Sequence, residues 1–297
     1  MKILNIGSLN LDHVYYVDHL VLPGETESAY ERKSFAGGKG LNQSIALAKA
    51  GAEVYHCGLI GSGGRLLLET CKQYGVHTDY IQELDAPNGH AVIQVDKDAR
   101  NSILLFGGTN QMFTEAFVDR VLADFGAGDP LLLQNEINLL PYIVDQASAR
   151  GMKIIMNPSP YNKKLAAVDL RKISLFLLNE VEGSQLTGKT QPDQILNDLQ
   201  QRFPSARVVL TLGEEGAIFA NGERRIRQSA FPVRAVDTTA AGDTFTGYYI
   251  AHWMLGLPEE EVLRISAKAA SIAVTREGAA DSIPDREEVI SALFARS

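Results

Sequence analysis

Short apolar runs alternate with longer amphipathic segments along most of this chain. Each run is four to seven residues long and carries mostly apolar side chains at consecutive positions. That pattern is typical of strands buried on both faces of a sheet. The runs occupy residues 3–6, 54–60, 131–134, 153–156, 175–178 and 208–212. They predict an α/β protein with a mostly parallel sheet, because helices that connect such strands cover both faces.

The segments between the runs carry signals for helix starts and ends. Helices are predicted at residues 42–50, 65–74, 114–125 and 245–255, with another beginning at Pro258. Gly51 and Gly75 follow the first two helices, where a glycine commonly ends a helix. Thr114 is a favoured residue for the cap of the third.

Two segments in the N-terminal third interrupt this alternation. Residues 11–36 are β-like around a Pro23-Gly24 turn, and residues 88–107 have the pattern of a hairpin with strands at 90–95 and 102–106. Neither segment has a helix of its own. We expect one domain over residues 1–297, with a small sheet from these two insertions that serves as a lid.

Composition and charge narrow the classes of protein. Of the 297 residues, 45% are hydrophobic and 22% charged, and the net charge of −8 disfavours a nucleic-acid or membrane-surface partner. Cys57 and Cys71 are far apart in sequence, which argues against a disulfide framework or a zinc site. No signal peptide or membrane-length apolar run is present, so we expect a cytoplasmic protein.

The stretch Asp237-Thr-Thr-Ala-Ala-Gly-Asp-Thr-Phe-Thr-Gly247 carries the clearest chemistry. Ala240, Ala241 and Gly242 lead directly into a buried helix. Small residues at a helix start leave backbone N–H groups open to an anion, which the helix dipole also favours. Asp243 lies at the same place and fits two interpretations: a base for an attacking hydroxyl group, or a simple N-cap.

A second glycine-rich stretch, Gly37-Gly-Lys-Gly40, precedes a helix predicted to begin at Asn42. It lacks the spacing of a Walker A loop, and a plain turn would also explain it. Glycines there allow a ligand close to the backbone, and the Asn42 amide suits a sugar hydroxyl. A dinucleotide site near Gly61 is excluded, because Leu66 stands where the third glycine is required.

Polar residues also follow several predicted strands, at the edge where ligands bind in open α/β folds. Asn10 and Asp12 have the i, i+2 spacing that points two side chains to one face, and we place them at the end of the first strand. Asn179-Glu-Val-Glu182 could orient hydrated Mg²⁺ or simply cap a helix. Thr211-Leu-Gly-Glu-Glu-Gly216 could cradle a nucleotide or form a hairpin, and Glu136 is a candidate for a polyol site.

Together these stretches resemble a known family. Gly37-Gly-Lys-Gly-Leu-Asn-Gln43 and Asp237-Thr-Thr-Ala-Ala-Gly-Asp-Thr-Phe245 are similar to the two signatures of the ribokinase family of carbohydrate kinases, also called the pfkB family. The resemblance implies a three-layer α/β/α domain with a small β lid. It also implies transfer of the γ-phosphoryl group of ATP to a hydroxymethyl group, with Mg²⁺ and an activating monovalent cation, usually K⁺.

The resemblance assigns roles to individual residues. Asp243 would be the base, and the N–H groups of Ala240, Ala241, Gly242 and Asp243 would form the anion hole. The residues implied to hold the sugar are Asn10, Asp12, Gly38, Lys39, Asn42 and Glu136. Those implied for the nucleotide end are Asn179, Glu182, Thr211, Gly213, Gly216 and Gly242, with Glu182 acting on Mg²⁺ indirectly. The implied cation site comprises Asp237, Thr239, Ala273, Arg276, Gly278 and Ser282.

The leading acceptor implied by the resemblance is D-ribose. A ketose, a deoxy-sugar acid or a nucleoside stays open, since Leu41 and Ser62 to Gly64 depart from the residues usual in the family. A non-catalytic sugar or nucleotide sensor is the less favoured alternative, because a sensor has no need of a base at residue 243. We expect the sugar and ATP as partners, and a homodimer formed through the β lid is possible.

Overall fold

The computed structural model describes residues 2–98, 100–222 and 224–294. Its main element is a nine-stranded sheet in the order β13-β12-β11-β10-β9-β8-β1-β4-β5. The strands are β1 (Lys2–Ile6), β4 (Glu53–Ser62), β5 (His77–Pro87), β8 (Pro130–Gln134), β9 (Lys153–Asn157), β10 (Leu175–Asn179), β11 (Arg207–Thr211), β12 (Ala217–Asn221) and β13 (Arg224–Gln228). The run from β11 to β5 is parallel throughout, and β12 and β13 are antiparallel.

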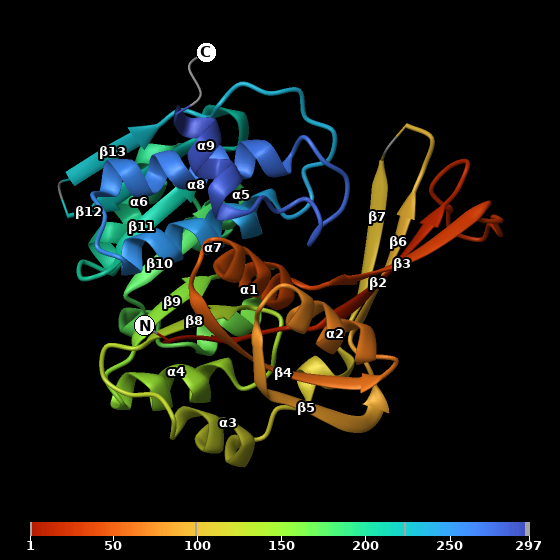
Figure 1. Ribbon diagram of the computed structural model, residues 1–297, viewed down its shortest axis with the longest axis horizontal. Helices are drawn as coiled ribbons and strands as arrows, with labels where there is room; N and C mark the ends of the chain where they lie inside the picture. Colours follow the sequence, from red (N-terminus) through yellow and green to blue (C-terminus); the bar gives the residue numbers. More distant parts are fainter. Residues whose placement is uncertain (1, 99, 223, 295–297) are drawn as a thin grey trace.

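Helices cover both faces of this sheet (Figure 1). One layer contains α1 (Lys39–Lys49), α2 (Arg65–Gln73), α7 (Ala241–Met254), α8 (Glu259–Ala273) and α9 (Arg286–Phe294). The other contains α3 (Glu115–Leu122), α4 (Leu140–Ala149), α5 (Glu180–Thr187) and α6 (Pro192–Arg202). No helix in the described ranges combines the length and the hydrophobicity that a bilayer span needs.

Side chains of consecutive strand residues pack alternately into two separate hydrophobic cores, one on each face of the sheet. Leu4 and Ile6 pack toward α3, α4 and α6, whereas Ile3 between them packs toward α1, α7 and α8. Leu131 and Leu133 repeat the alternation around Leu132. Burial on both faces explains the continuous apolar runs, and the predicted three-layer α/β/α architecture is confirmed.

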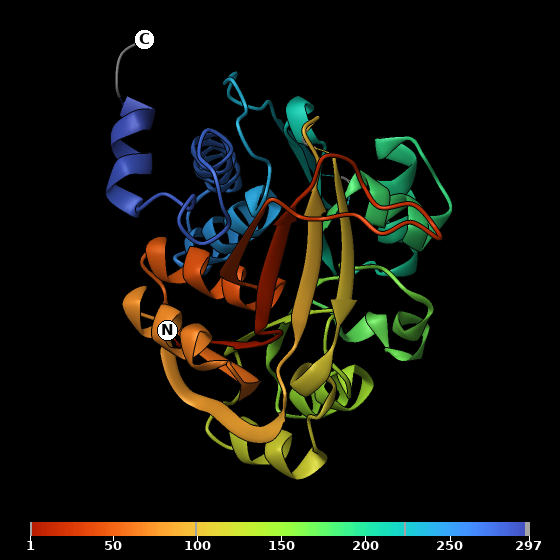
Figure 2. The same ribbon diagram turned by 90° about the vertical axis from the view of Figure 1, so that its right-hand side faces the viewer.

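A second, four-stranded sheet stands away from the main body (Figures 1 and 2). Its order is β3 (Glu31–Gly37), β2 (Asn10–Tyr16), β6 (His90–Val95) and β7 (Asn101–Phe106). β2 pairs in parallel with β6, and the other two pairs are antiparallel. The four strands come from the two segments that interrupt the strand–helix alternation. We call them the small sheet.

Some predicted boundaries are wrong. Asn10 and Asp12 do not end the first strand, because β1 stops at Ile6 and both residues open β2 of the small sheet. The first helix begins at Lys39, three residues before the predicted Asn42. Gly38 starts it with φ 96°, and a Cβ on Gly40 would lie 2.4 Å from the Ser8 nitrogen, so close packing at Ser8 requires glycine there.

Candidate functional site

The carboxylate of Asp243 lies at the first turn of α7 and is nearly inaccessible, with 7% of the residue exposed. Two amides from α1 hold it: Asn42 Nδ2 donates to Oδ2 at 3.2 Å and Gln43 Nε2 donates to Oδ1 at 2.8 Å. The oxygen of the Asn42 amide, Oδ1, is buried and has no hydrogen-bond partner among the described residues. It therefore faces the site as an acceptor suited to a hydroxyl group.

The start of α7 is open. Asp243 is the third residue of the helix, and Ala240 before it provides no side-chain cap, so the N-cap interpretation of Asp243 is wrong. Within the described ranges, the N–H groups of Gly242 and Asp243 have no acceptor, whereas that of Ala241 donates to Thr238 O at 3.3 Å. A Cβ built on Gly242 would meet nothing within 4 Å. This helix end can accept an anion without displacing the protein's own side chains.

Ala240 has a left-handed backbone, with φ 58° and ψ 8°. That conformation is unfavourable for a residue with a Cβ. Strain of this kind is concentrated at functional sites, where surrounding structure enforces it. We therefore connect the left-handed backbone of Ala240 with the open start of α7, and not with the stability of the fold.

Glu136 follows β8 and is held by the segment that begins α1. Ser8 Oγ donates to Glu136 Oε2, and the Lys39 backbone nitrogen donates to the same oxygen at 3.1 Å. Burial raises the pKa of Glu136, against the lowering effects of Ser8 and Lys39. Burial alone would lower the pKa of Lys39, but the charges of Asp243, Glu136 and Glu182 raise it overall. A positive charge at Lys39 thus lies among three carboxylates.

Asn10 and Asp12 reach the same region from β2, as their i, i+2 spacing predicts. Asn110 Nδ2 donates to Asn10 Oδ1 at 2.7 Å, which fixes the Asn10 amide. Asp12 lies against Gly37, where a Cβ would be 2.0 Å from Asp12 Oδ2. Burial, and then the charge of Glu136, raise the pKa of Asp12 to about 7.

A cavity of about 680 Å³ opens beside this group. Asn10, Asn110 and Glu136 line it together with Leu105 and Phe106 at the end of β7. Its lining mixes amides, a carboxylate and apolar side chains, which suits a small polyol. The small sheet therefore contributes directly to the wall of the site.

Sequence reasoning missed several residues here. Ser8 and Asn110 position Glu136 and Asn10, and Gln43 contacts Asp243. A signal existed for Gln43, which lies directly after Asn42 in the first signature. Ser8 and Asn110 had none, because their partners are more than 90 residues away in sequence.

The start of α5 lies at the carboxyl end of β10. Asn179 and Glu182 form a capping box: Glu182 N donates to Asn179 Oδ1 at 2.8 Å, and Asn179 N donates to Glu182 Oε2 at 3.1 Å. In the sheet register Asn179 lies beside Thr211, so the two strand ends meet. One carboxylate oxygen of Glu182 is outside the box, and a hard cation prefers such oxygen ligands.

Thr211 and the turn after it form part of a hairpin, since β11 and β12 are antiparallel. Gly213 opens the turn with φ 54°, and Gly216 closes it with φ 103°. A Cβ on Gly216 would lie 2.0 Å from Gln228 O. The hairpin interpretation is therefore correct, and its turn still lies at the carboxyl edge of the sheet beside Asn179.

The predicted cation-site residues come from two segments joined by hydrogen bonds. Asp237 Oδ1 accepts from Thr239 N and Oγ1, at 2.8 and 2.6 Å, and Oδ2 accepts from Gly278 N at 3.0 Å. The Arg276 side chain pairs with Glu288, and Ser282 Oγ donates to Ala279 O at 2.8 Å. Ala273 ends α8 just before this segment. Both oxygens of the Asp237 carboxylate thus join the two segments, and a carboxylate is a ligand type that suits a hard cation.

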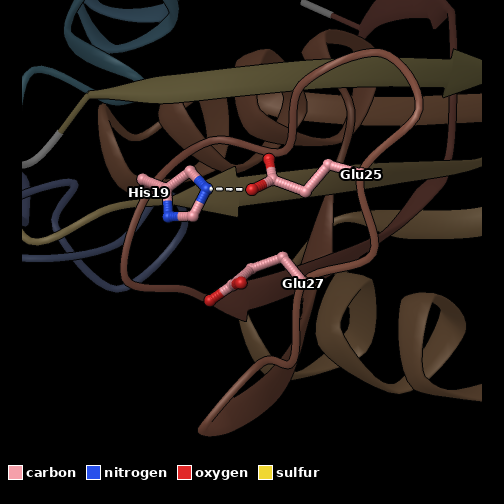
Figure 3. Close-up of side chains that lie close together, drawn as sticks. All are labelled: His19, Glu25 and Glu27. Atoms are coloured by element: carbon pink, nitrogen blue, oxygen red, sulfur yellow. Dashed lines mark hydrogen bonds and ion pairs between the residues drawn. The ribbon is translucent and has the colours of Figure 1, made fainter.

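Another acidic cluster lies in the connection between β2 and β3 (Figure 3). Potential ligand atoms of His19, Glu25 and Glu27 lie within 4.8 Å of one another. However, His19 Nε2 pairs with Glu25 Oε1 at 2.9 Å, and Glu25 Oε2 accepts from Leu22 N at 2.9 Å. These contacts brace the loop, and the cluster is explained without a metal ion.

Comparison with known proteins agrees with this geometry. The model of the family described as "pfkB family carbohydrate kinase" matches residues 1–286. Ribokinase from Haemophilus influenzae is 35% identical, with 97% of each chain covered, and ribokinase from Arabidopsis thaliana is 34% identical over 97% of this chain and 80% of its own. The crystal structure of ribokinase from Thermotoga maritima superimposes with a TM-score of 0.88 at 32% identity, with 99% of each chain covered. The structure of Arabidopsis thaliana ribokinase complexed with ribose and ATP gives 0.87 at 32% identity over 99% of each chain. The chain belongs to the pfkB family of carbohydrate kinases.

Proposed function

We propose that this enzyme transfers the γ-phosphoryl group of ATP to the hydroxymethyl group of a sugar, with D-ribose as the acceptor. The observation that carries the proposal is the Asp243 carboxylate, held by two amides beside an unfilled helix start. The relatives named ribokinase, and the Arabidopsis structure complexed with ribose and ATP, support ribose as the acceptor.

In this mechanism the sugar is held between the two sheets. Asn10 and Glu136, which line the cavity, would form hydrogen bonds with its ring hydroxyls together with Asp12, and Asn42 Oδ1 would accept one more. The attacking hydroxyl faces Asp243, which takes its proton as the oxygen bonds to the γ-phosphorus. The bond from that phosphorus to the β–γ bridging oxygen breaks, and ADP leaves. The N–H groups of Gly242 and Asp243 stabilise the charge on the transferring group.

The nucleotide end is assigned to the α5 start and the β11–β12 turn. Asn179 and Thr211 are neighbours there, and Gly213 and Gly216 shape the turn. Mg²⁺ would neutralise charge on the phosphates, and Glu182 would hold it through water by the oxygen outside the capping box.

A monovalent cation such as K⁺ would be held by Asp237 with Thr239, Ala273, Arg276, Gly278 and Ser282. Activity is then expected to rise when K⁺ replaces a bulky organic cation, and a flat response contradicts this site.

An acceptor screen tests the proposal. Release of ADP is measured with pentoses, ketoses, deoxy-sugars, sugar acids and nucleosides, and the product is identified by phosphorus NMR. Ribose is expected to give the highest kcat/KM and a phosphate ester at its hydroxymethyl carbon. If no sugar supports ADP release above the rate with ATP alone, the proposed function is wrong. A higher kcat/KM for another acceptor overturns only the choice of ribose.

We further propose that the whole chain acts as one catalytic domain, with residues 11–36 and 88–107 as a lid that also pairs two subunits. Exposed apolar side chains on β7 support the pairing: Leu104 is 71% exposed and Ile103 56%. Sedimentation should show a dimer that Leu104→Lys dissociates. The matched control, Leu255→Lys, changes a 64% exposed residue at the end of α7 and should not. A monomeric wild-type protein contradicts the pairing, though not the lid.

The ATP requirement and the buried free cysteines fit a cytoplasmic location.

A further inference from the structure

A buried chain of side-chain amides lies behind Asp243. Gln43 Nε2 uses both of its protons, one toward Asp243 Oδ1 at 2.8 Å and one toward Asn157 Oδ1 at 3.2 Å. Its carbonyl oxygen accepts from Gln134 Nε2 at 2.7 Å. Gln43 and Gln134 are 1% and 0% exposed, so neither group can exchange its partners for water.

The chain continues in one direction away from the site. Gln134 Nε2 gives its second proton to Asn5 Oδ1 at 3.0 Å. Asn5 Nδ2 in turn donates to Gly40 O and to Ser44 Oγ, both at 2.8 Å. The oxygens of Gln43 and Asn5 therefore both accept from the single NH₂ group of Gln134, whose own oxygen, Oε1, is buried without a hydrogen-bond partner among the described residues.

The far end of the chain fixes the orientation of the Asn5 amide, because the Gly40 backbone oxygen that Asn5 Nδ2 contacts can only accept. Ser44 Oγ also accepts from Asn5 and lies 2.8 Å from His56 Nδ1. His56 is fully buried, and burial lowers its pKa to about 4, which leaves the imidazole neutral. If any one amide were reversed, two oxygens or two NH₂ groups would face each other in a buried place.

We propose that Gln43 is a positioning residue for Asp243, and that the chain Gln134–Asn5–Ser44–His56 fixes which side of its amide faces the carboxylate. This inference rests on the proposed function, because it concerns the base of that reaction. Gln43 acts through Asp243 and does not itself touch the acceptor.

The orientation matters because a donor at 2.8 Å favours the ionised form of a carboxylate and restrains its rotation. A reversed Gln43 amide would instead direct an oxygen at Asp243. The charged groups coupled to this site are Lys39 on α1, Glu136 after β8 and Glu182 on α5. Each of them is unchanged in the variants below, so a response to the amide chain can be separated from a response to those charges.

Two variants at one buried position test the chain. Gln134→Glu keeps the size but replaces the NH₂ group with an acceptor, so Gln43 must turn its NH₂ toward residue 134 and its oxygen toward Asp243. Gln134→Met removes the donor without imposing the reversal. We expect kcat to fall by about tenfold to a hundredfold in Gln134→Glu, as for loss of a hydrogen bond to a charged group, and less in Gln134→Met. The acidic limb of the pH profile of kcat should move to higher pH in the same order, while KM for ATP changes little.

Ser266→Ala serves as the control for loss of a buried polar contact, since its hydroxyl donates to Val262 O within α8, outside the chain. It should lower the melting temperature without moving the pH profile. Carbon NMR of the labelled Asp243 carboxylate gives a second readout that needs no turnover. If folded Gln134→Glu and Gln134→Met keep the wild-type profile and the wild-type carboxylate titration, the inference is wrong. An inactive wild-type enzyme would instead overturn the proposed function, and the NMR titration would still test the chain.

Discussion

Two helices begin at the edge of the main sheet where we place the ligands, and their starts are built in opposite ways. At α5, Asn179 and Glu182 satisfy each other's backbone N–H groups in a capping box. At α7, Ala240 gives no side-chain cap, and its own backbone is left-handed. The acidic residue near each helix start also differs in where its hydrogen-bond partners lie. Glu182 bonds to its own helix start, whereas Asp243 bonds to Asn42 and Gln43, about 200 residues away.

The two helix starts differ in what stabilises them: local contacts at α5 and distant side chains at α7. The α5 start is stabilised by contacts within four residues, which the local sequence alone can provide. The α7 start depends on distant side chains, and it leaves N–H groups free at a small cost in stability. We infer that the α7 start is organised for an anion that arrives with the substrate, and that α5 supplies a rigid support for the nucleotide.

The largest expected effect comes from Asp243→Asn. The variant keeps the volume but loses the base, so kcat should fall by roughly 10²–10⁴. ATP binding, measured by calorimetry, should persist because the α7 N–H groups remain. Asp79→Asn removes an exposed charge on β5 and is the matched control, which should keep wild-type kcat. An unchanged kcat in Asp243→Asn refutes the assignment of the base.

Asp12→Asn tests the buried charge at the acceptor end. The native pKa of Asp12 is about 7 and its ordinary value 3.8, so ionisation in the folded state opposes folding. The stability that Asp12 contributes is fully present below about pH 4 and is lost as the pH rises to 7. Asp12→Asn lacks this loss, so above pH 7 it should be more stable than the wild type by no more than about 4 kcal/mol. Urea unfolding at pH 5 and pH 8 measures the gap. A gap that does not widen with pH contradicts the burial of this charge, while weakened sugar binding is expected in either case.

Gly242→Ala probes the open start of α7 itself. Nothing lies within 4 Å of the added methyl group, and alanine favours a helix, so stability should rise by about 0.5–1 kcal/mol. The methyl group occupies space meant for the transferring group, and a misplacement of that order costs roughly 10² in kcat. Gly126→Ala also meets nothing within 4 Å and should not change kcat. Full activity in Gly242→Ala would mean that the anion does not approach this helix start.

The same contrast explains what the sequence could predict. The strands and the three layers follow from apolar runs that are local, and the α5 cap follows from Asn179 and Glu182 being three residues apart. β5 was not predicted, because its residues are mostly exposed or half-buried and lack the apolar run of the inner strands. The network around Asp243 joins α1, α7, β1, β8 and β9, and no short pattern encodes such contacts. Asn10 and Asp12 were placed on the correct face but in the wrong sheet, since Gly7 to Leu9 carry the chain from one sheet to the other without a turn signal.

The smallest expected effect lies at the capping box of α5. Asn179→Ala removes the side chain that accepts from Glu182 N, which should lower the free energy of unfolding by about 1 kcal/mol. Thr114→Ala is a close control, because Thr114 Oγ1 caps α3 by accepting from Phe117 N at 3.3 Å, in a helix away from the site. Both variants should lose similar stability in chemical denaturation, but only Asn179→Ala should raise KM for ATP, since the proposed nucleotide end includes the start of α5 and not that of α3. If the two variants behave alike in both measurements, the α5 start is a structural cap and nothing more. The two helix starts would then differ in function as well as in construction, with substrate handled at α7 alone.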